Sequence, residues 1–296
     1  MEWAIELKGL QKTFDEITAV DNLSLEVPAG SIFGFLGPNG AGKTTTIKTM
    51  LGLLRADVGS GNILGFDIVR DSVAIRQRVG YVAEVQNLYD YMTVEGILSF
   101  CRSFYPKWNK KLADKYLDVF RLPRRVKIKN LSKGMKTQLA LVLAMAPEPE
   151  LLILDEPTSG LDTINRQEFL RIILEEISIQ GRTVFFSSHL LHDVERVADR
   201  IAIINNGTLI EVRDVDELKT VVKKIRVVFQ REPGADFFDY PGIVGIEKDG
   251  PAYLLSVEGN LQEILMHLKN TPYFTLDVVD RNLEDIFIEK VRGDGK

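Results

Sequence analysis

One segment near the N-terminus strongly restricts the folds open to this chain. Residues 37–44 read Gly-Pro-Asn-Gly-Ala-Gly-Lys-Thr and fit the pattern G-x-x-x-x-G-K-[ST]. An apolar run at 32–36 precedes the segment and predicts a buried strand, and a helical pattern follows over 44–54. Glycines let such a loop turn backbone N–H groups toward an anion, and the next helix directs its positive end there. The segment therefore predicts a phosphate-binding loop.

Two side chains at the end of this loop carry specific predictions. Lys43 is expected to reach the β- and γ-phosphates of a nucleotide, and the Thr44 hydroxyl to hold Mg²⁺. A chance match in a glycine-rich turn is the alternative. It is disfavoured because strand, loop and helix follow in the required order.

Composition limits the class of protein. The 296 residues suit a main domain with an additional piece, and a net charge of −5 gives no global basic field for nucleic acid or anionic lipid. The single cysteine, Cys101, cannot form an internal disulfide, which fits a reducing compartment, and we expect a buried, inert thiol. We expect no signal peptide and no membrane-spanning run, so another chain would do any spanning.

The pattern of elements favours an α/β fold. Apolar strands alternate with amphipathic helices after residue 131, which predicts a mostly parallel sheet covered on both faces. The predicted helices are 133–145, 166–179 and 190–198, and the predicted strands are 151–154, 183–186 and 201–204. Earlier strands are expected at 3–8, 23–27 and 78–82, with a helical region over 94–122 that breaks near Pro106.

A basic stretch follows that helical region, with Arg121, Arg124, Arg125, Lys127 and Lys129. It is either a solvated surface or a docking face for an acidic partner or phospholipid head groups.

The last part of the chain differs in character. Residues 222–296 hold expected strands at 225–230, 243–247, 252–257 and 275–279, and expected helices at 260–269 and 282–291. These elements predict a small α+β unit, and nothing in it resembles a catalytic motif.

Two acids end the apolar strand at 151–154. That strand would fix Asp155 beside the phosphate-binding loop, where it can hold Mg²⁺. Glu156 can orient and deprotonate a water molecule in line with the γ-phosphate. A helix N-cap is the alternative for such a pair.

Further polar residues follow or precede these acids at ordered positions. Ser132 and the Gly134 N–H precede a helix and can form a second anion site, although Ser-x-Gly is also a common N-cap. His189 ends the strand predicted at 183–186, where a lone histidine is usually structural.

With this order of motifs, the chain resembles the ATP-binding cassette family over about residues 3–215. The resemblance implies a P-loop NTPase fold with a mixed sheet core, a helical subdomain at about 86–145 and an antiparallel β subdomain. It implies a nucleotide-binding domain over 1–220 and a C-terminal accessory α+β extension over 221–296.

The resemblance also implies residue roles and ligands, ATP and Mg²⁺. Glu156 would be the catalytic base, His189 the switch that senses the γ-phosphate, and Asp162 part of the loop linking two sites. Ser132 and Gly134 would contact ATP held by a partner subunit. The remaining implied nucleotide contacts are Phe14 on adenine and Gly37, Asn39, Gly40, Ala41, Gly42, Lys43, Thr44 and Thr45 on phosphate, with Thr44, Asp155 and Glu84 serving the metal.

Two positions depart from the family pattern. The family has Gln in the loop after residues 80–82, whereas this chain has Glu84 there and Gln86 two residues later; we favour Glu84 for the role. The signature carries Lys133 and Met135 where the family has Gly and Gln, and Lys133 adds positive charge near the trans phosphate.

The resemblance implies an exporter at the cytoplasmic face of the membrane. Its partners would be a separate polytopic permease subunit, docking near Tyr89, Tyr91 and Met92, and a second nucleotide-binding subunit, either a copy or a paralogue. No nucleic acid is expected. The alternatives are a soluble cassette ATPase acting on ribosomes or nucleic acid, and a small-molecule P-loop kinase, which leaves Ser132 and His189 unexplained.

Overall fold

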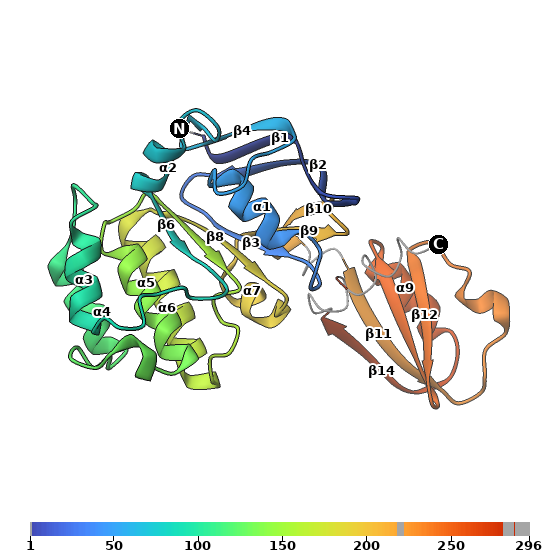
Figure 1. Cartoon of the computed structure of the whole chain (residues 1–296). Helices are drawn as coiled ribbons and strands as arrows, with labels where there is room; N and C mark the ends of the chain where they lie inside the picture. Colours follow the sequence, from blue (N-terminus) through green and yellow to red (C-terminus); the bar gives the residue numbers. More distant parts are fainter. Residues whose placement is uncertain (1, 218–221, 281–286, 288–296) are drawn as a thin grey trace. The chain divides into compact units, whose positions relative to one another are not determined.

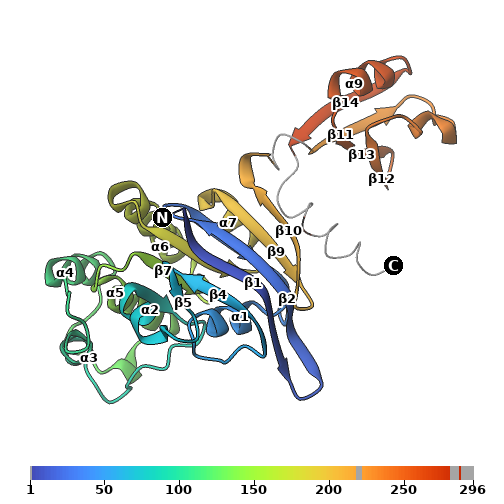
Figure 2. The same ribbon diagram turned by 90° about the horizontal axis from the view of Figure 1, so that it is seen from above.

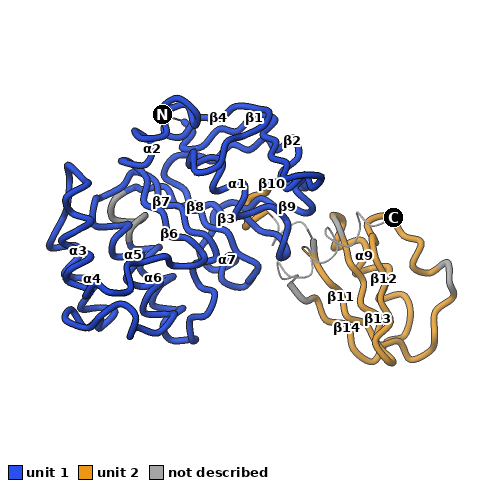
Figure 3. Tube along the Cα trace, in the orientation of Figure 1, with its two compact units in different colours: residues 1–212 blue, residues 213–296 orange. Residues whose placement is uncertain are grey.

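The computed structural model describes residues 2–217, 222–280 and 287. The chain divides into two compact units, residues 1–212 and 213–296, which Figure 3 colours separately. The predicted boundary at 220/221 and the roles assigned to the two domains stay predictions.

A six-stranded sheet forms the centre of unit 1, in the order β10-β9-β3-β8-β7-β6. Neighbours from β9 to β6 pair in parallel, and every residue of β3, β7 and β8 is buried, as continuous apolar strands predict. A two-residue turn joins β9 to β10, which only an antiparallel pair allows. The strands are β3 (Ile32–Leu36), β6 (Val79–Val82), β7 (Leu151–Asp155), β8 (Thr183–Ser188), β9 (Arg200–Asn205) and β10 (Thr208–Asp214).

A second sheet in unit 1 has the order β2-β1-β4-β5 and is antiparallel. Alternate residues of β2, such as Leu23, Leu25 and Val27, are buried, so one face packs on the core. This sheet is the predicted antiparallel β subdomain. Its strands are β1 (Trp3–Phe14), β2 (Ile17–Pro28), β4 (Val58–Ile63) and β5 (Phe66–Asp67).

The helices of unit 1 cover the parallel sheet. α1 contacts β7, α5 contacts β6, α6 contacts β8, and α7 contacts β3 and β8 (Figure 1). The predicted break in the helical region is confirmed, because α3 and α4 are separate and begin after the caps Thr93 and Asn109. The helices are α1 (Lys43–Met50), α2 (Ser72–Arg78), α3 (Val94–Arg102), α4 (Lys110–Val119), η1 (Ile128–Asn130), α5 (Lys133–Met145), α6 (Thr163–Gln180) and α7 (Leu191–Val197).

Unit 2 holds an antiparallel sheet in the order β12-β13-β11-β14, with α9 packed on it. Its core includes Ile225 and Leu255 from the sheet and Ile264 and Leu268 from α9. The elements are β11 (Val222–Phe229), η2 (Ala235–Phe238), β12 (Ile243–Asp249), β13 (Ala252–Glu258), α9 (Leu261–Lys269) and β14 (Tyr273–Asp280). This confirms the predicted α+β unit, while the helix expected at 282–291 lies outside the described residues apart from residue 287.

In the described part of the chain, no helix has both the length and the apolar character needed to cross a membrane.

Candidate functional site

The glycine-rich loop connects β3 to α1, as predicted. Gly40 and Gly42 have φ values of 82° and 101°, which favour glycine. A Cβ on Gly42 would lie 2.3 Å from the carbonyl oxygen of Ala19, so a side chain cannot fit. Gly42 caps α1 without a side-chain hydrogen bond, and the first N–H groups of the helix therefore face the loop. The segment forms an anion-binding cradle.

Most of the predicted site residues line one cavity of about 280 Å³ beside this loop. They come from the loop, from the segment after β6 and from the end of β7. The lining residues are Ala19, Asn39, Gly40, Ala41, Gly42, Lys43, Thr44, Thr45, Glu84 and Glu156. The fold therefore brings together residues that are more than a hundred positions apart in the chain.

The Lys43 ammonium group lies buried among oxygen atoms. Its Nζ donates to the carbonyl oxygens of Gly37 at 2.7 Å and Pro38 at 3.1 Å, and lies 3.1 Å from Oε1 of Glu156. The side chains of Lys43 and Glu156 are each 6% exposed. A buried cation needs such partners, because desolvation of an unpaired charge is costly. The loop lysine is thus paired with Glu156.

Glu156 also contacts the residue that ends β8. Its Oε2 lies 2.7 Å from Nδ1 of His189 and accepts from the His189 backbone N–H at 3.3 Å. Glu156 itself has a φ of 49°, in the left-handed region that is unfavourable for a residue with a side chain. The carboxylate is therefore fixed between a lysine and a histidine at the edge of the cavity.

Asp155 lies one position earlier and is fully buried at the end of β7. The Ser187 hydroxyl donates to Oδ1 of Asp155 at 2.7 Å and accepts from the Glu156 backbone N–H at 3.0 Å. The Thr44 hydroxyl is also close enough to Asp155 to lower the pKa of that carboxyl group. Burial raises the pKa of Asp155 above its ordinary value, and the nearby charges of Glu84 and Glu156 add to this rise.

The surroundings of Asp155 fit a divalent cation. Its Oδ2 is buried and has no hydrogen-bond partner among the described residues. The Thr44 hydroxyl and the Asp155 carboxylate are hard oxygen donors, which Mg²⁺ prefers together with water and substrate phosphates. A cation there would offset the repulsion among the three carboxylates that raises the Asp155 pKa.

The geometry separates Glu84 from Gln86. Glu84 lines the cavity beside the glycine-rich loop. Gln86 instead donates its side-chain amide to the Ala83 carbonyl and lines a different pocket. Of the two candidates, Glu84 alone lines this cavity, where its carboxylate could serve a metal.

Four predicted residues lie away from this cavity. Ser132 caps α5, where its hydroxyl accepts from Met135 N–H at 3.2 Å, and Gly134 follows it in the first turn. Asp162 accepts from the Asn165 backbone and side chain at 2.9 and 2.6 Å. Phe14 is 43% exposed, at the end of β1. None of the four lines the cavity within their own chain.

The loop that contains Asp162 contacts the segment after Ser132. A Cβ on Gly134 would lie 3.1 Å from the Leu161 side chain, and one on Gly160 would lie 3.1 Å from Lys133. Gln138 of α5 donates to the Asn165 side chain at 2.8 Å, and Asn165 in turn donates to Asp162. The start of α5 and the loop before α6 therefore form one connected surface.

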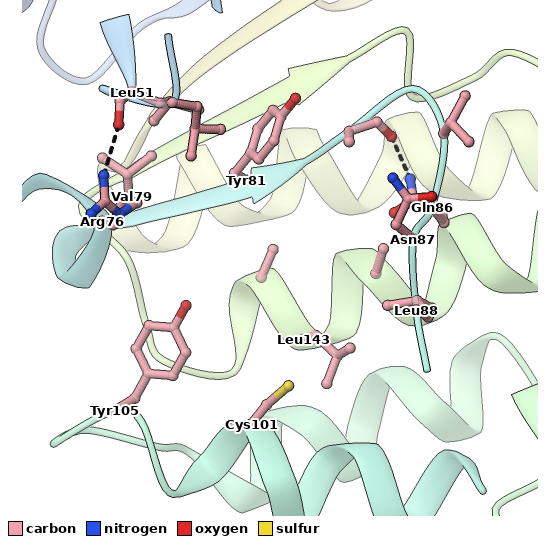
Figure 4. A pocket seen from close by; sticks show the side chains of 15 residues that line it. Leu51, Arg76, Val79, Tyr81, Gln86, Asn87, Leu88, Cys101, Tyr105 and Leu143 are labelled. Atoms are coloured by element: carbon pink, nitrogen blue, oxygen red, sulfur yellow. Dashed lines mark hydrogen bonds between the residues drawn. The ribbon is translucent and has the colours of Figure 1, made fainter. Parts of the chain in front are cut away.

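A second pocket was not predicted from the sequence. It lies between the segment after β6 and the helices α3 and α5, and Figure 4 shows Tyr81, Gln86, Cys101 and Leu143 around it. Cys101 is only partly buried, whereas the sequence predicted a buried thiol, because its side chain borders this pocket. Its partial burial still raises the pKa of the thiol, which disfavours the reactive thiolate. Ser187 was also missed as a site residue, because its position opposite Asp155 follows from the β7–β8 register and not from a local sequence pattern.

Comparison with known proteins shows the family. Residues 20–159 match the family model described as ABC transporter. The chain is 31% identical to the ABC transporter ATP-binding protein YtrB of Bacillus subtilis, over 98% of each chain. It is 32% identical to the bacitracin transport ATP-binding protein BcrA of Bacillus licheniformis, over 99% of each chain.

A solved structure agrees with this result. An ATP-binding subunit of an ABC transporter matches with a TM-score of 0.66 at 29% identity, covering 73% of this chain and 92% of that one. With two relatives above 30% identity that it matches almost from end to end, this chain belongs to the ABC transporter ATP-binding proteins.

Proposed function

We propose that this ATP-hydrolysing transporter subunit powers an exporter from the cytoplasmic face of a membrane, with Mg²⁺ as its cofactor. One observation carries the ATP chemistry: the loop, Lys43, Thr44 and the carboxylates of Glu84 and Glu156 converge on one cavity. Names of relatives support transport, since two are called bacitracin transport ATP-binding proteins. The names of these relatives give no support to a ribosomal or nucleic-acid role.

In the proposed mechanism, binding and hydrolysis use different groups. The loop N–H groups and Lys43 bind the phosphates, and Thr44, Asp155 and Glu84 would hold Mg²⁺, which neutralises phosphate charge when bound. Glu156 exchanges its contact with Lys43 for a water molecule and accepts that water's proton. His189, already 2.7 Å from Oε2, orients this carboxylate and senses the γ-phosphate.

A second nucleotide-binding subunit would complete the site. Ser132 and Gly134 lie outside the cavity of their own chain but expose a helix N-terminus, which suits an anion. We infer that this surface contacts ATP held by the other subunit in a head-to-tail dimer, and that hydrolysis removes the contact and opens the dimer. The loop that contains Asp162 would couple the two nucleotide-binding sites of the dimer.

The membrane subunit would dock at the pocket of Figure 4. Leu88 lines this pocket, and Tyr89, Tyr91 and Met92 follow at once in the chain. The Tyr89 and Tyr91 rings are 49% and 68% exposed, with centroids 5.9 Å apart, so they present apolar area that a partner can bury. Unit 2 would hold or regulate the dimer.

Purification of the tagged chain from detergent-solubilised membranes tests this proposal. We expect a polytopic membrane protein in stoichiometric amount, and phosphate release that needs ATP and Mg²⁺. A Tyr89→Ser/Tyr91→Ser variant should lose the membrane protein but still bind ATP. Recovery of ribosomes in place of a membrane protein would refute the transport role. ATP-driven uptake of cargo into inside-out vesicles tests the export direction.

A further inference from the structure

The helical subdomain carries a charge opposite to that of the rest of the chain. Residues 86–145 contain 12 Lys and Arg against four Asp and Glu, a net charge of +8. The whole chain has a net charge of −5, so the other residues sum to −13. Positive charge is therefore concentrated in one subdomain.

The acids of this subdomain neutralise only two of its cations. Asp90 pairs with Lys136 at 2.8 Å. Glu95, Asp114 and Asp118 all pair with Arg124, at 3.6, 2.6 and 3.4 Å. The remaining positive charge has no acidic partner within the subdomain.

Eight cations stay exposed after this pairing. Lys115 is excluded because it lies 3.9 Å from Glu175, and Lys133 because it belongs to the proposed ATP contact surface. Among the residues that the structure describes, none of the eight forms an ion pair. They are Arg102, Lys107, Lys110, Lys111, Arg121, Arg125, Lys127 and Lys129, and we call them the basic face.

The three segments that carry the basic face lie close together. Arg102 at the end of α3 and Lys110 at the start of α4 line one hollow, together with Glu95 and Asp114. The same two acids bind Arg124, next to Arg125. Both views place α3 and α4 at the end of unit 1 opposite β2 and β10 (Figures 1 and 2).

We propose that the basic face binds the surface of a bilayer rich in anionic phospholipid. Charge complementarity supports this partner, since each Lys or Arg near such a surface contributes about 1 kcal/mol, which is about fivefold in binding. Long, unpaired side chains spread over three segments suit a fluid, uniformly negative surface. The inference adds a direct membrane contact to the proposed function and does not depend on ATP hydrolysis.

Vesicle flotation of the purified full-length chain tests the proposal. The wild type should float with vesicles of phosphatidylcholine and phosphatidylglycerol but not with pure phosphatidylcholine, and salt should weaken binding. The test variant is Lys110→Gln/Lys111→Gln/Lys127→Gln/Lys129→Gln. The control, which changes the net charge equally at exposed cations elsewhere, is Lys8→Gln/Lys48→Gln/Arg55→Gln/Lys269→Gln.

We expect the test variant to bind anionic vesicles several hundredfold more weakly, at about fivefold per cation, and the control to bind as the wild type does. ATP binding by both variants checks their folding. If the test variant does not fold, Arg102→Gln/Lys107→Gln/Arg121→Gln/Arg125→Gln replaces it, with the same expectation.

Three results would overturn the proposal. The wild type fails to float with anionic vesicles, or the control loses binding as much as the test variant, or the test variant retains it. Suppose that the wild type fails to float and that the test variant, but not the control, no longer co-purifies with the membrane subunit. The basic face would then bind an acidic surface of a protein and not a bilayer. Normal ATP turnover without flotation refutes only this inference, whereas flotation without turnover refutes only the proposed function.

Discussion

Replacing Glu156 by Gln should change ATP affinity and ATP turnover in opposite directions. Oε1 of Glu156 lies 3.1 Å from the Lys43 ammonium group, and both side chains are 6% exposed. Glutamine has nearly the same shape but no charge. The substitution therefore removes the ionic partner of Lys43 and also removes the proposed base.

The contacts set the size of both effects. General-base catalysis contributes about 10²- to 10⁴-fold, so turnover should fall by about that factor. Removing one partner of a buried ion pair costs about 3–5 kcal/mol, and in the proposed mechanism Lys43 exchanges Glu156 for phosphate when ATP binds. If about half of that cost is relieved by ATP, ATP binding tightens by about 10- to 70-fold.

Calorimetric titration with ATP and Mg²⁺, followed by phosphate release, measures both quantities. Glu150→Gln is a matched control, because Glu150 pairs with Arg78 at 3.3 Å on the surface and its side chain is 55% exposed. We expect the control to match the wild type. Turnover within about tenfold of the wild type would refute the role of Glu156 as base, since a base contributes more than that. An unchanged or weaker affinity would show that the Lys43 contact does not compete with ATP.

Three further outcomes follow from the same contacts. Lys43→Ala should weaken ATP binding in calorimetry, and unchanged affinity would contradict the phosphate-binding role. Ser187→Ala removes the hydroxyl that joins Asp155 to the Glu156 N–H, so the free energy of unfolding in urea should fall by about 1–3 kcal/mol. The pKa of Asp155 is higher in the folded state than its ordinary value of 3.8. Ionisation of Asp155 therefore destabilises the fold as the pH rises from the unfolded-state pKa through the folded-state pKa. Asp155→Asn should therefore raise the melting temperature at pH 7 and abolish Mg²⁺-dependent turnover; a lower melting temperature would contradict the sign.

The fold was predictable where local patterns are strong. The continuous apolar strands β3, β7 and β8 and the helix α5 appear where the sequence predicts them. The helix α2 was missed because it is short and buries a single residue, Ile75, so it leaves no helical periodicity. β10 was missed because its residues are only partly buried at the edge of the sheet.

The site was predictable as a set of residues but not as a set of contacts. Motif spacing identified Lys43, Asp155 and Glu156, because each type of side chain has a defined role with phosphate or metal. The contact between Lys43 and Glu156 depends on how β3 and β7 are placed in the sheet, with β8 between them. The role of Ser187 likewise depends on strand register, which no local pattern encodes.

The contact between Lys43 and Glu156 explains how this chain can keep a cation buried. A lysine that is 6% exposed and lacks a counter-ion would destabilise the fold by several kcal/mol. Glu156 supplies that counter-ion. In the proposed mechanism, phosphate takes over the role of counter-ion when ATP binds, and the Glu156 carboxylate would then be free to act as the base. The same contact would therefore serve both the stability of the fold and the control of hydrolysis.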